Sequence, residues 1–169
     1  MESVWWPFFI CPIEFYGQIV EFARKRAKRL AEENNTVTLR HDPENYGENL
    51  MAWPADGPVK CSDIIKMWFD EYKMIANWSD PESAGLQVYH FTQVAWRGTK
   101  HFGCGSATLK DTGWVFISCN YYPPGNYLTE FTANVYPPLD VNEPSVDNEI
   151  NTTKVVSRND GCECVCEVR

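Results

Sequence analysis

The sequence has no hydrophobic run that approaches the roughly 20 residues needed to span a bilayer. It has no excess of positive charge either, because 15 Lys and Arg stand against 23 Asp and Glu, for a formal net charge of −8. An acidic surface disfavours nucleic-acid binding and electrostatic docking on anionic lipid. No internal repeat is visible, and Glu2 excludes the myristoylation signal, which needs Gly in that place. These absences predict a protein with no transmembrane segment and no nucleic-acid partner.

What the sequence does contain favours a folded, extracellular domain. Its 169 residues suit about one domain, and 44% of them are hydrophobic. Seven cysteines cannot all pair within one chain, so one is free, pairs elsewhere, or has its partner outside this sequence. The cysteines and three N-glycosylation acceptors favour secretion, although residues 4–10 lack the positive flank and cleavage site of a signal peptide. The three acceptors are Asn34, Asn77 and Asn151.

Apolar periodicity predicts two helices. Residues 19–33 place apolar side chains three and four apart, with Lys and Arg on the opposite, solvated side. A second helix is predicted to begin at Ser62 or Asp63, with a buried stripe that runs to Ile75. The turn-rich residues 39–58 between the two helices are expected to be held by packing rather than by regular structure.

Three strands are predicted after these helices, over residues 91–96, 103–108 and 114–121. The last two form a hairpin closed at residues 110–113, which opposes Cys104 and Cys119 closely enough for a disulfide. The pairing of Cys11, Cys61, Cys162, Cys164 and Cys166 stays open, and a metal site at the last three is disfavoured because they lack the Cys-x-x-Cys spacing. Two helices followed by strands indicate an α+β layered domain.

Four polar residues, His41, Glu48, Glu71 and His90, lie in apolar or turn-bound sequence contexts. Two imidazoles and two carboxylates form a ligand set that suits a divalent metal such as Zn²⁺. On spacing alone, however, four unrelated side chains with ordinary partners are the more frequent case. The residues by themselves therefore leave both interpretations open.

Five motifs in order resemble those of the CAP superfamily, the cysteine-rich secretory, antigen-five and pathogenesis-related proteins that share the SCP domain. Residues 90–99 (HFTQVAWRGT) and 116–127 (FISCNYYPPGNY) resemble its two signatures. The shorter motifs are similar at 46–50 (YGENL), at 68–71 (WFDE) and in the Ala-rich residues 23–31. Residues 134–138 (NVYPP) are similar to the animal branch that includes the Golgi-associated member.

The resemblance implies a three-layer α-β-α sandwich with a mainly antiparallel central sheet over residues 15–138. Residues 1–14 form a non-matching N-terminal segment, and residues 139–169 form an acidic, Cys-containing tail. Because about 20 residues ahead of Glu21 do not match, the family's first helix and any lipid groove beside it are expected to be incomplete. Tyr89, which replaces the usual Gly before His90, is expected to crowd the mouth of the cleft.

The resemblance also implies a central cleft lined by His41, Glu48, Glu71 and His90. His41 and His90 would be the metal ligands, with the two glutamates as partners, and Zn²⁺ would be bound without being required. Buried amides would support the loops around the cleft, since an unsatisfied amide costs about 1–3 kcal/mol. These amides are Asn49, Gln93 and Asn126, and the side chains expected in the core are Trp53, Trp68 and Trp96.

The function that follows from the resemblance is a secreted, non-enzymatic binding module for a sterol, a fatty acid, a protein partner or a second copy of the chain. The alternative is a metal- or acid/base-assisted hydrolase such as a peptidase, in which Glu48 or Glu71 activates water and a His orients the substrate. No nucleophile is evident, because Cys104 and Cys119 are expected to be paired. A venom-like or defence protein that acts through its surface loops is the third interpretation.

Overall fold

The computed structural model describes residues 13–33, 39–42, 45–54, 61–109 and 111–138. The elements in chain order are α1 (Ile13–Glu33), β1 (Gly47–Pro54), α2 (Cys61–Asp70), the 3-10 helices η1 (Glu71–Met74), η2 (Pro81–Ala84) and η3 (Leu86–Val88), α3 (Tyr89–Val94), β2 (His101–Thr108), β3 (Trp114–Tyr122) and α4 (Phe131–Asn134). No helix in these ranges has the length and apolar character of a membrane span.

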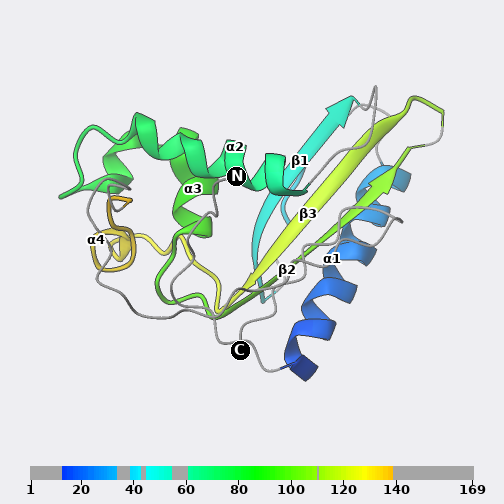
Figure 1. The fold of residues 1–169 in the computed structure, drawn as a ribbon, viewed down its shortest axis with the longest axis horizontal. Coiled ribbons are helices and arrows are strands. Elements are labelled where there is room, and N and C mark those ends of the chain that lie inside the picture. The colour runs from blue at the N-terminus through cyan, green and yellow to red at the C-terminus, as the bar shows by residue number, and fades with distance from the viewer. Residues whose placement is uncertain (1–12, 34–38, 43–44, 55–60, 110, 139–169) are drawn as a thin grey trace, which may run out of the picture.

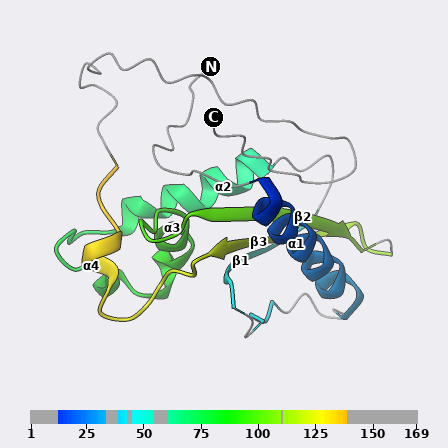
Figure 2. The same cartoon turned by 90° about the horizontal axis from the view of Figure 1, so that it is seen from below.

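The sheet is antiparallel, with the strand order β1-β3-β2. Strand β3 is central and pairs with both neighbours along their whole length, from Gly47 opposite Tyr121 to Pro54 opposite Trp114 on one side. Helix α1 lies on one side of the sheet and α2, α3 and α4 lie on the other (Figure 1). In the perpendicular view, α1 overlaps the strands and α4 lies far from α1 (Figure 2). The predicted α-β-α sandwich is confirmed.

Two hydrophobic cores fill the spaces between these layers. On the α1 side, Leu30 packs with Leu50 and Phe116 of the sheet. On the other side, Trp68 of α2 packs with Ile117 and Cys119. Full burial of a large apolar side chain contributes about 1.5–3 kcal/mol, so both faces of the sheet depend on their helices.

The α1 layer approaches the sheet unusually closely at two glycines of β2. A Cβ atom added at Gly103 would lie 2.7 Å from the backbone nitrogen of Val20, and one at Gly105 would meet the backbone of Arg24. Glycine is therefore required at both positions for α1 to rest on the strand backbone. The predicted buried stripe of α1 is confirmed, and the helix begins at Ile13 rather than at residue 19.

The expectation that residues 39–58 lack regular structure is wrong for Gly47–Pro54, which form β1. The strand is covered on both faces around Asn49 and Leu50, which are both buried. A strand buried on both faces loses the apolar–polar alternation that marks a strand in sequence. Trp53, expected in the core, is exposed near the end of this strand, whereas Trp68 and Trp96 are buried as predicted.

The strand predicted over residues 91–96 is also wrong, because Tyr89–Val94 form α3. Residues 91–94 of this helix are buried one after another. A short continuous buried run fits a helix as well as a strand, so its periodicity could not decide between them. By contrast, the predicted hairpin is confirmed, with Cys104 directly opposite Cys119 and joined to it by a disulfide.

Two smaller expectations concern the ends of the chain and the second helix. Helix α2 begins at Cys61 and ends at Asp70, and the predicted stripe continues to Ile75 through the 3-10 helix η1. Residues 1–12 and 139–169 lie outside the described residues, and with them the expected absence of the family's first helix and the predicted tail.

Candidate functional site

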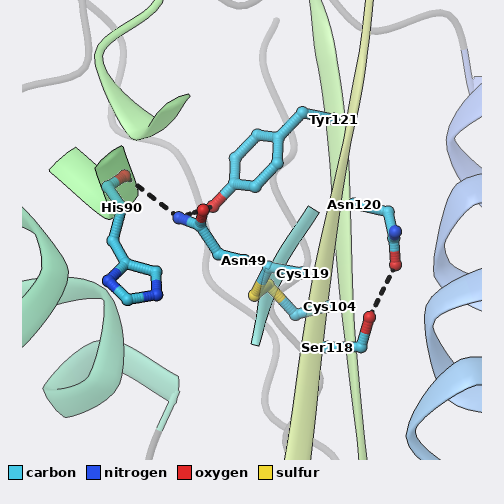
Figure 3. The surroundings of a disulfide bond; sticks show 7 residues. All are labelled: Asn49, His90, Cys104, Ser118, Cys119, Asn120 and Tyr121. Atoms are coloured by element: carbon cyan, nitrogen blue, oxygen red, sulfur yellow. Dashed lines mark hydrogen bonds between the residues drawn. A yellow bond between two sulfur atoms is a disulfide. The ribbon is translucent and has the colours of Figure 1, made fainter. Parts of the chain in front are cut away.

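Successive side chains of β1 point to opposite sides of the sheet, and this separates the predicted site residues. Glu48 turns toward α1, where its carboxylate meets Arg26. The next residue, Asn49, turns toward the opposite side of the sheet, where its amide meets the backbone of His90 in α3. Figure 3 shows Asn49 directed toward α3, with Asn120 and Ser118 of β3 on the α1 side. The four predicted residues therefore form two pairs, which we name the His41 pair (His41, Glu48) and the His90 pair (His90, Glu71).

In the His41 pair, His41 Nδ1 lies 3.0 Å from Glu48 Oε1. The backbone N–H of Asp42 donates to the same carboxylate oxygen at 3.2 Å. The other oxygen, Oε2, accepts a hydrogen bond of 2.8 Å from Arg26 Nε. Both oxygens of Glu48 are thus engaged, and its side chain is only 4% exposed, whereas that of His41 is 67% exposed.

Charge balance favours the ionised form of Glu48. Burial raises the pKa of its carboxyl, but the hydrogen bonds from His41 and Arg26, together with the Arg26 charge, outweigh burial and leave the pKa below its ordinary value. An ionised carboxylate only accepts hydrogen bonds, so His41 Nδ1 must carry the proton that it shares with Glu48. In a neutral imidazole the free lone pair is then on Nε2, the ring nitrogen that does not face Glu48.

Arg26 is a site residue that the sequence analysis missed. It was assigned to the solvated basic face of the first helix, but its side chain is 5% exposed and lies beside Glu48. The signal was present in the spacing, because Arg26 comes three residues after Ala23 and four before Leu30, both of which are buried. A buried guanidinium needs paired partners, and here it finds them in Glu48 and in the backbone carbonyl of Arg40.

The His90 pair is built by the helices on the other side of the sheet, and Asn49 connects it to β1, the edge strand that also carries Glu48 of the His41 pair. His90 Nδ1 lies 2.8 Å from Glu71 Oε1, and the backbone N–H of Phe91 donates to Glu71 Oε2 at 3.1 Å. Glu71 opens η1 directly after α2, so the pair joins two helical segments that are 19 residues apart in sequence. Both oxygens of this carboxylate are engaged too, and His90 Nε2 is again the ring nitrogen not used in the pair.

The ring of His90 is held by an aromatic neighbour. The indole of Trp68 stacks on the imidazole with 5.5 Å between ring centroids and an interplanar angle of 17°. Asn49 Nδ2 donates to the backbone carbonyl of His90 at 3.0 Å and lies 3.3 Å from the hydroxyl of Tyr121 (Figure 3). His90 is therefore fixed at its ring face, at Nδ1 and at its backbone.

The three amides expected to support the loops around the cleft differ in burial. Asn49 and Gln93 are buried, whereas Asn126 is half-buried. Gln93 Oε1 accepts a hydrogen bond from the backbone N–H of Gly125, and Asn126 Nδ2 donates to the carbonyl of Tyr89. Both amides thus hold the loop after β3 against α3. Tyr89 itself packs its ring on Phe131 of α4, at 5.5 Å between centroids.

Comparison with known proteins identifies the family. A family model described as "Cysteine-rich secretory protein family", abbreviated CAP, matches residues 16–121, which is more than half of the chain. The chain belongs to the CAP family. Among its relatives, "Pathogenesis-related protein 1A1" from Solanum lycopersicum is 33% identical over 139 residues, which cover 82% of this chain and 74% of the relative. "Basic form of pathogenesis-related protein 1" from Nicotiana tabacum is 39% identical over 117 residues, or 69% of this chain and 62% of the relative.

Solved structures agree with this fold. The structure described as "Structure of BmVAL-1" aligns with a TM-score of 0.51 at 29% identity, over 66% of this CAP chain and 58% of that chain. "Crystal structure of NaASP2 with Zn2+" aligns with a TM-score of 0.50 at 24% identity, over 65% of this chain and 59% of that chain, and supports the fold alone. The alignments thus span less than two thirds of these two solved chains. The placement near the Golgi-associated animal branch stays a prediction.

The donor chemistry of this CAP domain fits Zn²⁺ through imidazole nitrogen, because each histidine has its Nδ1 held by a carboxylate and its Nε2 left over. In the described residues, no group of three or more His, Cys, Asp or Glu side chains is gathered closely enough to hold an ion. Within the part of the chain that the structure describes, no hydrogen bond or ion pair runs from a side chain of the His41 pair to one of the His90 pair. The metal role of His41 and His90 therefore stays a prediction.

Of the other predicted positions, Asn77 is exposed, and its Oδ1 accepts a hydrogen bond from the backbone N–H of Ser79 in the same acceptor tripeptide. Asn34 and Asn151 lie outside the described residues. So do Cys11, Cys162, Cys164 and Cys166, and the side chain of Cys61 is not described. Glycosylation and the pairing of these cysteines stay open.

Proposed function

We propose that this CAP-family chain is a secreted, non-enzymatic binding module that holds a divalent cation such as Zn²⁺ through His41 and His90 and presents its scaffold to a sterol, a fatty acid or a protein partner. One observation carries the proposal: each imidazole is anchored at Nδ1 by a carboxylate whose second oxygen is also occupied. This is the arrangement in which an outer carboxylate fixes a histidine ligand in the tautomer that binds metal at Nε2.

The same observation disfavours the hydrolase alternative. A general base must reach the proton that it removes, within about 2.6–3.2 Å. The oxygens of Glu48 are occupied by Arg26, His41 and the Asp42 N–H. The oxygens of Glu71 are occupied by His90 and the Phe91 N–H. The glutamates are thereby suited to orient the histidines. When bound, Zn²⁺ would supply a positive centre for an anionic or carbonyl group of a ligand.

Zinc titration by calorimetry tests the cation site. The wild type is expected to bind Zn²⁺ with a measurable heat, and the His41→Ala/His90→Ala double variant is expected to lose at least about tenfold in affinity. His101→Ala is the matched control, because it removes the third histidine of the chain, which lies on β2 outside both pairs. Equal affinities for the wild type and the double variant would reject the site.

The ligand class needs a separate measurement. Saturable binding of a fluorescent sterol or fatty acid by the purified chain would support the lipid branch of the proposal. If neither probe binds, with or without Zn²⁺, the lipid branch is rejected and the protein partner remains. Recovery of the glycosylated protein from the culture medium of cells that express the full-length gene tests secretion, and retention in the cell lysate would contradict it.

A further inference from the structure

Arg26 occupies a place that a side chain of its kind rarely takes. It lies along the buried stripe of α1, one turn after Ala23 and one turn before Leu30, and all three residues are buried. Moving a guanidinium out of water costs several kcal/mol unless its donors and charge find partners. Its position therefore needs an explanation in the contacts that it makes.

Those contacts join three parts of the chain. Arg26 Nε donates to Glu48 Oε2 in β1, and its Nη2 donates to the backbone carbonyl of Arg40. Asp42 Oδ2 lies 3.9 Å from the same Nε. His41 thus sits between two residues that Arg26 contacts, and its own Nδ1 is bonded to the carboxylate that Arg26 holds.

The fork of the guanidinium is what allows this arrangement. Arginine presents planar, fixed donors that can serve two acceptors at once, whereas lysine presents a single point charge on a flexible stem. One side chain can therefore fix both the rotamer of Glu48 and the backbone of residues 40–42. Among the described residues, no aromatic ring stacks on the exposed His41 ring as Trp68 stacks on His90, so the orientation of His41 depends on these anchors.

We propose that Arg26 is the positioning residue of the His41 pair: it fixes the Glu48 carboxylate and holds the 40–42 segment against α1, and so keeps His41 Nδ1 directed at Glu48 and its Nε2 directed away from that carboxylate. The inference rests on the proposed cation site only for its functional consequence. The orientation of His41 by Arg26 concerns the metal-free protein and can be tested without any metal.

The chain supplies a matched control in Arg29. It lies one turn further along α1 and pairs with Asp42, in the same segment, but in the described residues it forms no hydrogen bond or ion pair with Glu48 or His41. Loss of Arg29 therefore removes an α1 cation and a tie to residue 42 while leaving the carboxylate that holds the imidazole. A general effect of charge or of segment anchoring would appear in both variants.

The test is ¹⁵N NMR of the histidine rings in the zinc-free full chain, for wild type, Arg26→Met, Arg26→Lys and Arg29→Met. In the wild type, the shifts of His41 are expected to report one tautomer, protonated at Nδ1. In Arg26→Met they are expected to move toward an average of the two tautomers, while the His90 shifts stay in place. Arg26→Lys should lie between the two, and Arg29→Met should match the wild type.

Zinc titration of the same four proteins gives the functional readout. Loss of an outer partner of a histidine ligand typically weakens metal binding by 10–100-fold, so Arg26→Met is expected to lose about tenfold and Arg29→Met less than about twofold. Unchanged His41 shifts in Arg26→Met would overturn the inference. If the Met variant does not fold, unchanged His41 shifts in Arg26→Lys would overturn it instead. If the shifts move as expected but the wild type binds no Zn²⁺, the proposed function fails and the positioning role stands.

Discussion

The His41 pair and the His90 pair contain the same two side-chain types, yet different surroundings hold them. The carboxylate of the His41 pair is 4% exposed and carries a buried guanidinium on its second oxygen. The carboxylate of the His90 pair is 17% exposed and uses a backbone N–H there, while the imidazole rests on an indole. The surroundings of each carboxylate therefore determine what each pair depends on. The His41 pair depends on a charged residue that is distant in sequence, and the His90 pair depends on a backbone N–H and on aromatic packing.

The largest expected effect comes from removing each carboxylate in turn. Glu48→Ala leaves the Arg26 guanidinium buried without its main partner and is expected to lower the free energy of unfolding by about 3–5 kcal/mol. Glu71→Ala leaves His90 Nδ1 and the Phe91 N–H without their acceptor and is expected to cost about 1–3 kcal/mol. Urea unfolding of both variants at neutral pH measures the difference.

The control for this pair of variants is Glu21→Ala on α1. Glu21 forms an exposed ion pair with Lys25, so its loss is expected to cost no more than about 1 kcal/mol. Equal losses for Glu48→Ala and Glu71→Ala would show that the buried guanidinium does not set the two pairs apart.

A slightly smaller effect is expected from the disulfide, which belongs to the His90 side of the sheet. Cys104 and Cys119 are 15 residues apart, and a crosslink over such a loop contributes about 3 kcal/mol. The Cys104→Ala/Cys119→Ala variant is expected to lose about that much in urea unfolding. Because the bridge lies in the core with Trp68, the ring shifts of His90 should change more than those of His41. Larger changes at His41 would contradict this division.

Next in size is Asn49, which connects the sheet to the His90 pair. Asn49→Ala removes the buried amide that donates to the His90 carbonyl, at an expected cost of about 1–3 kcal/mol. Tyr121→Phe is the matched variant, because it removes the hydroxyl beside the same amide but keeps the bond to His90. The midpoint of thermal unfolding is expected to be lower for Asn49→Ala than for Tyr121→Phe. The reverse order would show that the contact of Asn49 with Tyr121 matters more than its contact with His90.

Local patterns in the sequence predicted the elements whose partners are close in the chain. The amphipathic spacing predicted α1, and the β-rich run with its turn predicted the hairpin and therefore the disulfide. Strand β1 was missed because both its faces are covered and its partner, β3, lies about 70 residues later. The helix at residues 89–94 was missed because its buried run carries no period.

The same limit applied to the candidate site. The family resemblance named His41, Glu48, Glu71 and His90, but only a strand at Gly47–Pro54 sends Glu48 and Asn49 to opposite faces. Without that strand the division into two pairs could not be predicted. Arg26 was missed for a different reason: a charged residue in an apolar stripe is usually assigned to solvent, and its buried partner is 22 residues away.

The smallest expected effect is a change in the free energy of unfolding at acid pH, and it distinguishes Glu48 from an ordinary surface carboxylate. Hydrogen bonds from His41 and Arg26 overcome the effect of burial and hold the pKa of Glu48 below its ordinary value of 4.5, so folding favours the ionised form. Its contribution is then fully present above pH 4.5 and is lost as the pH falls through the lower, folded-state pKa. The difference in unfolding free energy between wild type and Glu48→Gln is therefore expected to shrink below pH 4.5.

Asp70 provides the contrast for this measurement. Hydrogen bonds from Lys66 and Lys73 also lower the pKa of Asp70, but the three side chains lie at the surface. Salt screens exposed charges far more than buried ones, so high salt should remove the pH-dependent difference between wild type and Asp70→Asn. The Glu48→Gln difference should persist in the same salt, because Glu48 and Arg26 are both buried. If salt abolishes both differences alike, the Arg26–Glu48 contact is solvated, and the distinction between the two histidine pairs loses its electrostatic basis.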